Sequence, residues 1–97
     1  NVIVLGDFND DIDSGTPFSN FISDNANYLF TDETIAAGIS ANWSYPSFPS
    51  HIDHILISNE LFDNLEETRT IKLSSCVSGY SSFVSDHRPI ISVFKAD

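Results

Sequence analysis

The sequence predicts an α/β fold in which one mixed sheet is accompanied by few helices. Two apolar segments, residues 2–5 and 52–57, are rich in β-branched side chains and are typical of strands covered on both faces. A third apolar segment, residues 89–94, begins with a proline, which suits the first position of a strand because proline cannot donate to the ladder. Only residues 18–22 space their apolar side chains as one face of a helix does.

The first part of the chain predicts a strand, a polar loop and a helix. The strand at residues 2–5 leads into a loop at residues 10–15, which consists almost entirely of polar residues and glycine. Either Ser14 or Thr16 can cap the helix that follows, because a side-chain hydroxyl accepts a hydrogen bond from a free amide of the first turn. We expect this helix to end near Asn25.

The middle of the chain alternates between short ordered segments and loops. Residues 28–30 form a brief apolar stretch, and residues 34–41 are interpreted as irregular. Residues 42–50 contain three aromatic residues and two prolines, which predicts an extended loop anchored by its rings. After the strand at residues 52–57, a serine and an asparagine can cap a short helical turn at residues 60–62.

The last part of the chain predicts two further strands joined by a loop. Residues 67–74 alternate moderately between polar and apolar side chains, as a strand with one wet face does. Residues 74–82 are rich in serine and predict a loop before the final strand. The order of elements favours a mixed sheet with a helix on one face, and it leaves the other face without cover.

Length and charge limit what the chain does. The 97 residues allow one domain, and the balance of 14 acidic against 4 basic residues gives a net charge of -10. Four cations cannot build an extended basic surface for nucleic acid. No apolar run approaches the roughly 20 residues that a membrane-spanning helix needs, so we expect no transmembrane segment. The single Cys76 excludes an internal disulfide and is expected to be a half-buried side chain rather than a nucleophile.

Polar residues of catalytic type cluster at the end of the first strand. Asp7 and Asn9 follow Gly6 directly and lie two residues apart, so both side chains can point to the same side. A carboxylate beside a carboxamide can orient a water molecule, a metal ion or a phosphate oxygen. The alternative is an ordinary loop, because aspartate and asparagine also favour turns.

Two later segments place histidine beside aspartate. Asp53 lies inside an otherwise apolar strand, where a carboxylate is costly unless it is paired, so we expect it to have a partner such as a histidine. Strand alternation predicts that His51 shares one face with Asp53 and that His54 takes the other face as an ordinary strand residue. Before the last strand, Asp86 and His87 offer a metal ligand and a general base together.

These segments, taken in order, carry a family resemblance. Gly-Asp-Phe-Asn, Ile-Asp-His-Ile-Leu and Ser-Asp-His-Arg-Pro-Ile are similar to motifs of the endonuclease/exonuclease/phosphatase superfamily, which has the deoxyribonuclease-I-like fold. The resemblance covers residues 6–94 and implies the C-terminal half of such a domain over residues 1–97. It therefore implies half of a four-layer α/β sandwich, in which two sheets pack face to face with helices outside.

The resemblance also implies roles for particular residues. His87 would be the general base, and Asp53 would orient it and stabilise its protonated form. Asn9 would donate a hydrogen bond to a phosphate oxygen. Asp86 and Asp7 would be the metal ligands, with Asp86 binding directly or through water, and Asp7 would in addition position the nucleophile or assist proton transfer. The implied cofactor is Mg²⁺ or Mn²⁺, because family members hydrolyse phosphate esters with a divalent metal.

The resemblance does not identify the substrate, and it implies that residues of the active site lie outside this chain. The substrate could be DNA, RNA, a nucleotide, a phospholipid headgroup or an inositol phosphate. Family members carry a further Asn, a metal-binding Glu and a second His upstream of the Gly-Asp-Phe-Asn segment. We therefore expect a missing N-terminal half in the same protein, an isolated chain that is inactive or nearly so, and a homodimer that covers the exposed sheet face of the isolated chain.

Two other functions fit parts of the sequence. A half-fold that keeps the motifs can be a non-catalytic module that binds a partner or has a structural role. The other alternative is an acidic calcium-binding loop, because the first ligand positions of such a loop are matched. Against it, Phe18 occupies the twelfth position, where a calcium loop needs a glutamate. The residues of that loop would be Asp7, Asn9, Asp10, Asp11 and Asp13.

Overall fold

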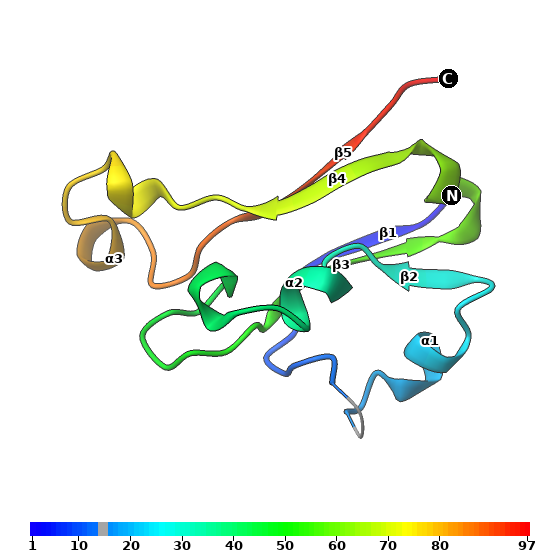
Figure 1. Cartoon of the computed structure of the whole chain (residues 1–97), viewed down its shortest axis with the longest axis horizontal. Helices are drawn as coiled ribbons and strands as arrows, with labels where there is room; N and C mark the ends of the chain where they lie inside the picture. Colours follow the sequence, from blue (N-terminus) through cyan, green and yellow to red (C-terminus); the bar gives the residue numbers. More distant parts are fainter. Residues whose placement is uncertain (14–15) are drawn as a thin grey trace.

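Five strands form two separate antiparallel sheets in the computed structural model, which describes residues 1–13 and 16–97 (Figure 1). The larger sheet has the order β1-β3-β2, and the smaller sheet pairs β4 with β5. The strands are β1 (Ile3–Asp7), β2 (Tyr28–Phe30), β3 (Asp53–Ser58), β4 (Leu65–Thr70) and β5 (Ile90–Phe94).

The prediction of one mixed sheet is wrong. Every paired strand runs antiparallel to its neighbour, and no pair joins the two sheets. Parallel neighbours need a crossover of a dozen or more residues, usually a helix that packs on the sheet. The longest α-helix in the described part of the chain has only 5 residues, which is too short to form such a crossover. The α/β class itself agrees with the structure.

The helices are short and more numerous than the sequence predicts. The α-helices are α1 (Ser19–Ser23), α2 (Glu33–Ala36) and α3 (Tyr80–Phe83), and the 3-10 turns are η1 (Ser40–Asn42), η2 (Asn59–Asn64) and η3 (Leu73–Ser75). Residues 34–41 and 74–82 are thus not simply loops. The predicted first helix is confirmed only at its centre, since α1 ends before Asn25.

The predicted helix caps that fall on described residues are not formed. Thr16 accepts a hydrogen bond from the amide of Phe18 and so shapes the turn before α1, and Ser14 lies outside the described residues. Ser58 accepts from the amide of Val2 instead of capping η2. Cys76 is exposed, which contradicts the half-buried environment expected for it.

The hydrophobic core lies on one face of the larger sheet. Ile12, Phe30 and Leu56 form its buried centre, and several aromatic side chains pack around them. The ring of Phe8 meets those of Phe18 and Phe30 edge to face, with centroids 5.4 and 6.0 Å apart. The loop after β1 is therefore fixed to the sheet by its own aromatic residue, which also fixes the end of β1.

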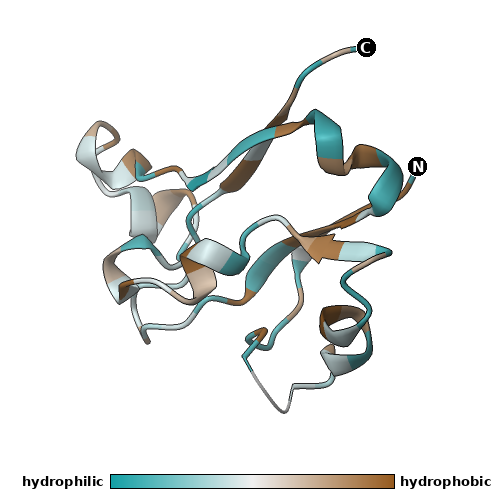
Figure 2. Cartoon of the chain, turned by 45° about the vertical axis from the view of Figure 1, so that its right-hand side comes forward, coloured by the Kyte–Doolittle hydropathy of each residue, from teal (hydrophilic) through white to brown (hydrophobic). Residues whose placement is uncertain are grey.

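The smaller sheet faces the larger one through β5, which contacts β3. β1 and β5 are the strands next to the two ends of the chain (Figure 2); β1 begins with three apolar residues, and β5 is apolar except for Ser92. A cavity of about 230 Å³ lies between them and is lined by residues of β1, β3 and β5. No helix in the described part of the chain has the length and apolar character to cross a membrane.

Candidate active site

A short hydrogen bond joins Asp53 and His87, which lie 34 residues apart in the chain. The Oδ2 atom of Asp53, the first residue of β3, lies 2.6 Å from Nδ1 of His87, on the segment before β5. The carboxylate can only accept, so Nδ1 carries the proton and donates it. This contact leaves Nε2 of His87 as the nitrogen that can take up a proton.

Two further carboxylates lie near that free nitrogen. Asp7 Oδ2 and Asp86 Oδ1 are each 3.9 Å from Nε2 of His87. The register of the larger sheet places Asp7 directly opposite Asp53, because β1 ends where β3 begins. The sheet pairing therefore brings together residues that are 46 positions apart in the sequence.

The surrounding carboxylates change the proton affinity of His87. Partial burial alone would lower the pKa of this imidazole. The hydrogen bond to Asp53 and the negative charges of Asp53, Asp7 and Asp86 outweigh burial and raise its pKa above the ordinary value of 6.5. The neighbouring carboxylates thus stabilise the protonated, imidazolium form of His87.

Asn9 occupies a turn that directly follows β1. Its amide donates to Oδ1 of Asp7 at 2.8 Å, and its backbone has a positive φ of 54°, a conformation that asparagine adopts more readily than most residues. The Asn9 side chain is exposed and makes no hydrogen bond within the described residues. The structure therefore holds its backbone beside Asp7 and leaves its carboxamide free to contact a ligand.

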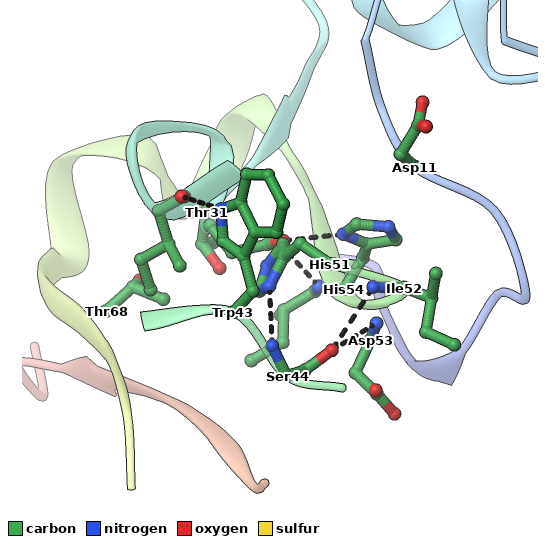
Figure 3. A network of polar contacts seen from close by, with 12 residues as sticks. Asp11, Thr31, Trp43, Ser44, His51, Ile52, Asp53, His54 and Thr68 are labelled. Carbon is green, nitrogen blue, oxygen red and sulfur yellow. Dashed lines mark hydrogen bonds and ion pairs between the residues drawn. The ribbon is translucent and has the colours of Figure 1, made fainter. Parts of the chain in front are cut away.

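Ser44 is buried and forms hydrogen bonds to the two segments that carry Asp53 and His87 (Figure 3). Its Oγ accepts from the amides of Ile52 and Asp53 at 3.2 and 3.1 Å. Its carbonyl accepts from the amide of Arg88 at 2.6 Å, one residue after His87. Ser44 thus fixes the backbone on both sides of the pair, and the sequence contains no local signal for this role.

Tyr45 and Tyr80 hold His87 from two other directions. The ring of Tyr45 stacks on the imidazole, with centroids 5.0 Å apart and an angle of 26° between the planes. The hydroxyl of Tyr80 donates to the carbonyl of His87 at 3.0 Å. The predicted aromatic loop at residues 42–50 contains Tyr45, but its composition does not indicate which ring meets the histidine.

A second polar cluster is buried deeper, around Asp32. Oδ2 of Asp32 lies 2.6 Å from Nδ1 of His54 and 2.8 Å from Nε2 of His51. His51 and His54 therefore meet on one side, and the prediction that His51 shares a face with Asp53 is wrong. The reason is that β3 begins at Asp53, so strand alternation does not extend back to His51.

The proton arrangement makes the Asp32 cluster a buried ion pair. Both nitrogens of His54 face acceptors, Asp32 and the carbonyl of Asp10 at 2.8 Å, so the ring donates twice and is an imidazolium. Burial would lower the pKa of His54, but the hydrogen bond and charge of Asp32 raise it. Burial would likewise raise the pKa of Asp32, yet its hydrogen bonds with His51, His54 and the Ile55 amide lower it to about 2.

The same arrangement makes the Asp32 cluster a poor metal site. A neutral histidine that binds a metal through one nitrogen normally donates a proton from the other. His51 Nδ1 instead faces the amide of Ser44 at 3.1 Å, which requires it to be an acceptor. Nε2 of His51 therefore carries the proton that binds Asp32 and has no lone pair for a metal.

The outer cluster fits a hard divalent cation better. Asp7, Asp53 and His87 each offer one ligand atom, and these atoms lie within 4.8 Å of one another. Asp7 and Asp86 are accessible, and in the described structure neither forms an ion pair with a lysine or arginine; His87 is the basic side chain near both. Magnesium prefers carboxylate oxygens and keeps several of its waters, so two accessible carboxylates match its needs.

The sequence comparison agrees with the motifs at this site. Residues 1–87 match the endonuclease/exonuclease/phosphatase family, and this range includes Asp7, Asn9, Asp53 and His87. No curated protein and no solved structure gives a significant match. Members of the family are typically hydrolases of the phosphoesterase or nuclease type and generally depend on divalent metals. The chain belongs to the endonuclease/exonuclease/phosphatase family.

Proposed function

We propose that this chain contributes the general base to metal-dependent hydrolysis of a phosphate ester, as a nuclease or another phosphodiesterase. The observation that carries the proposal is the orientation of His87. Its Nδ1 donates to Asp53 at 2.6 Å, so its Nε2 faces the accessible side where Asp7 and Asp86 lie. A histidine held in this way by a carboxylate is the arrangement that general-base catalysis requires.

Each residue of the site has a separate role in the proposed reaction. His87 accepts the proton of the attacking water at Nε2, and Asp53 stabilises the imidazolium that results. Asp7 orients the water, and the Asn9 carboxamide donates to a phosphate oxygen on which charge develops. Asp7 and Asp86 would hold a magnesium or manganese ion, which would offset the charge of the phosphate and lower the pKa of bound water.

We propose that the site is incomplete within these residues, because the family resemblance implies an additional metal-binding glutamate. Neither group of potential metal ligands in the described part of the chain contains a glutamate, although the sequence has four of them. We therefore propose that further ligands come from another part of a longer protein. On this proposal the isolated chain hydrolyses phosphate esters slowly or not at all.

Diester hydrolysis by the full-length protein tests this function. We expect Mg²⁺-dependent hydrolysis of bis(p-nitrophenyl) phosphate by the full-length protein, and little or none by residues 1–97 alone. His87→Gln and Asp53→Asn should each lower kcat by about 10²- to 10⁴-fold, the usual contribution of a general base. Asp63→Asn is the matched control, because Asp63 is exposed and lies outside the site.

Three results would each contradict part of this proposal. Full activity in His87→Gln would exclude His87 as the base, and robust turnover by the isolated chain would show that no further ligand is needed. If calorimetric titration with Mg²⁺ and Mn²⁺ detects no binding to the full-length protein, the chain is better described as a non-catalytic partner-binding module.

A further inference from the structure

A cavity of about 270 Å³, with both polar and apolar surface in its lining, opens beside the candidate base. Its walls come from the loop at residues 45–50 on one side and from η3 and α3 on the other, which lie at the same end of the molecule (Figure 1). Asp86 and His87 are part of its lining, whereas Asp7 is not. A group bound in this cavity would therefore extend away from the point where Asp7, Asp86 and His87 converge.

The lining of this cavity is rich in hydroxyl groups. It includes four serine residues from three separate segments: Ser47, Ser74, Ser81 and Ser85. Ser85 Oγ accepts from the amide of His87, while the hydroxyls of Ser47, Ser74 and Ser81 make no hydrogen bond to other described residues. Each such hydroxyl offers one donor and two acceptor positions. A ligand that both donates and accepts hydrogen bonds matches this lining.

The charges around the cavity limit the ligand further. Arg88 is the only lysine or arginine of its lining, and the same guanidinium nitrogen donates to the carbonyls of Ala41 and Trp43. Asp86 contributes a negative charge to the lining. A single, partly engaged cation does not offset the charge of a polyphosphate or of a run of nucleic-acid backbone, where successive phosphates repel an acidic wall.

We propose that this cavity binds a neutral polyhydroxylated group, a sugar or another polyol, that carries the phosphate ester. The inference rests on the proposed function, because it places the phosphate at the rim beside His87. It also specifies the substrate class, since the ester would present one phosphate group to the acidic site and several hydroxyls to the serines. An apolar lipid tail or a stack of bases would leave these hydroxyls without partners.

The test compares two phosphate monoesters that differ only in the group carried by the phosphate. Ribose 5-phosphate has free hydroxyls, and ethyl phosphate has none. Binding of each to the full-length protein is measured with Mg²⁺ by calorimetric titration. We expect ribose 5-phosphate to bind about tenfold more tightly. Ser74→Ala and Ser81→Ala should each reduce its affinity about two- to tenfold, the usual effect of one lost hydrogen bond, and leave ethyl phosphate unchanged.

Ser82→Ala is the matched control for these variants. Ser82 is the exposed neighbour of Ser81 on α3 and does not line the cavity, so its replacement should not change either affinity. Equal affinities for the two esters would overturn the sugar proposal and leave the hydrolase proposal intact. The same holds if Ser74→Ala and Ser81→Ala bind ribose 5-phosphate normally. If neither ester binds, the sugar proposal is refuted, and hydrolysis of bis(p-nitrophenyl) phosphate decides the hydrolase proposal separately.

Discussion

His87 is held in one orientation by three different kinds of contact. The carboxylate of Asp53 binds Nδ1, the ring of Tyr45 stacks on one face, and the hydroxyl of Tyr80 binds the backbone carbonyl. A general base contributes most when its lone pair already points at the proton it removes. Tyr45 therefore acts on His87 as a positioning residue that does not need to touch the substrate.

Removing the Tyr45 ring should slow hydrolysis without preventing substrate binding. A stacked aromatic pair contributes about 0.5–1.5 kcal/mol, so Tyr45→Ala in the full-length protein should lower kcat about two- to tenfold and change KM little. Tyr45→Phe keeps the ring and should restore kcat, because no hydrogen bond of the Tyr45 hydroxyl contributes to the contact. A fall in kcat that is equally large in Tyr45→Phe would show that stacking is not the cause. Steady-state kinetics on bis(p-nitrophenyl) phosphate measures both constants.

The longer strands were predictable from sequence, whereas the short helices and most site contacts were not. β1 and β3 follow continuous apolar runs, which give a local signal. α2 has only 4 residues, and its sequence carries no amphipathic repeat. Helices of this length have little stability of their own and form because tertiary packing holds them.

In the candidate site, too, features that depend on neighbouring residues in the sequence could be predicted, and contacts between distant residues could not. Asp53 could be predicted to need a partner, because a carboxylate in an apolar strand is costly. That this partner is His87 followed only from the family resemblance, since the two residues are 34 positions apart. Ser44 and Tyr45 escaped prediction because their roles depend on how the loop at residues 42–50 packs on β3 and not on their own neighbours in sequence.

Asp32, which follows β2, connects this end of the strand to β3 through hydrogen bonds. Its Oδ1 accepts from the amide of Ile55, and its Oδ2 binds His54, so a single buried carboxylate bridges the turn after β2 and the central strand. Both Asp32 and His54 are almost completely buried, at 0% and 1% exposure. A buried charge of this kind is tolerated only with its partner charged as well.

The Asp32–His54 ion pair should make stability greatest at mildly acidic pH. The pKa of Asp32 falls from 3.8 to about 2 on folding, so its contribution is complete above 3.8 and is lost as pH falls toward 2. The pKa of His54 rises above 6.5 on folding, so its contribution is complete below 6.5 and is lost as pH rises through the folded value. Urea unfolding should therefore give the largest free energy of unfolding between these two limits.

A histidine outside the core serves as the control for this profile. His87 also has a raised pKa, so its removal in His87→Asn should weaken the alkaline decline without abolishing it. The acid limb should not change, because it arises from Asp32. A free energy of unfolding that stays constant between pH 5 and pH 9 in His87→Asn would contradict the charged state assigned to His54.

As a whole, the molecule is flatter and more open than its size predicts. Its radius of gyration is 13.9 Å, whereas about 12.5 Å is typical of a compact domain of this length. Its extents are 41 × 35 × 19 Å, and its accessible surface of 6077 Å² exceeds the roughly 5500 Å² expected for its mass. The extra surface includes β1, whose residues Ile3, Val4 and Leu5 are 48%, 47% and 67% exposed.

The exposed strand β1 should cause the isolated chain to self-associate. β1 is an edge strand of the larger sheet, so it combines unpaired backbone groups with adjoining apolar side chains, and both favour pairing with another strand. Light scattering of residues 1–97 at increasing concentration should show a rise toward the mass of a dimer. Val4→Glu should suppress this rise, because a charge at the centre of β1 opposes burial in a molecule that already carries a net charge of -10. Val77→Glu adds the same charge at a valine of similar exposure outside β1 and should leave the association unchanged. A monomeric mass at all concentrations, or equal suppression by both variants, would show that β1 is not the surface through which the chains associate.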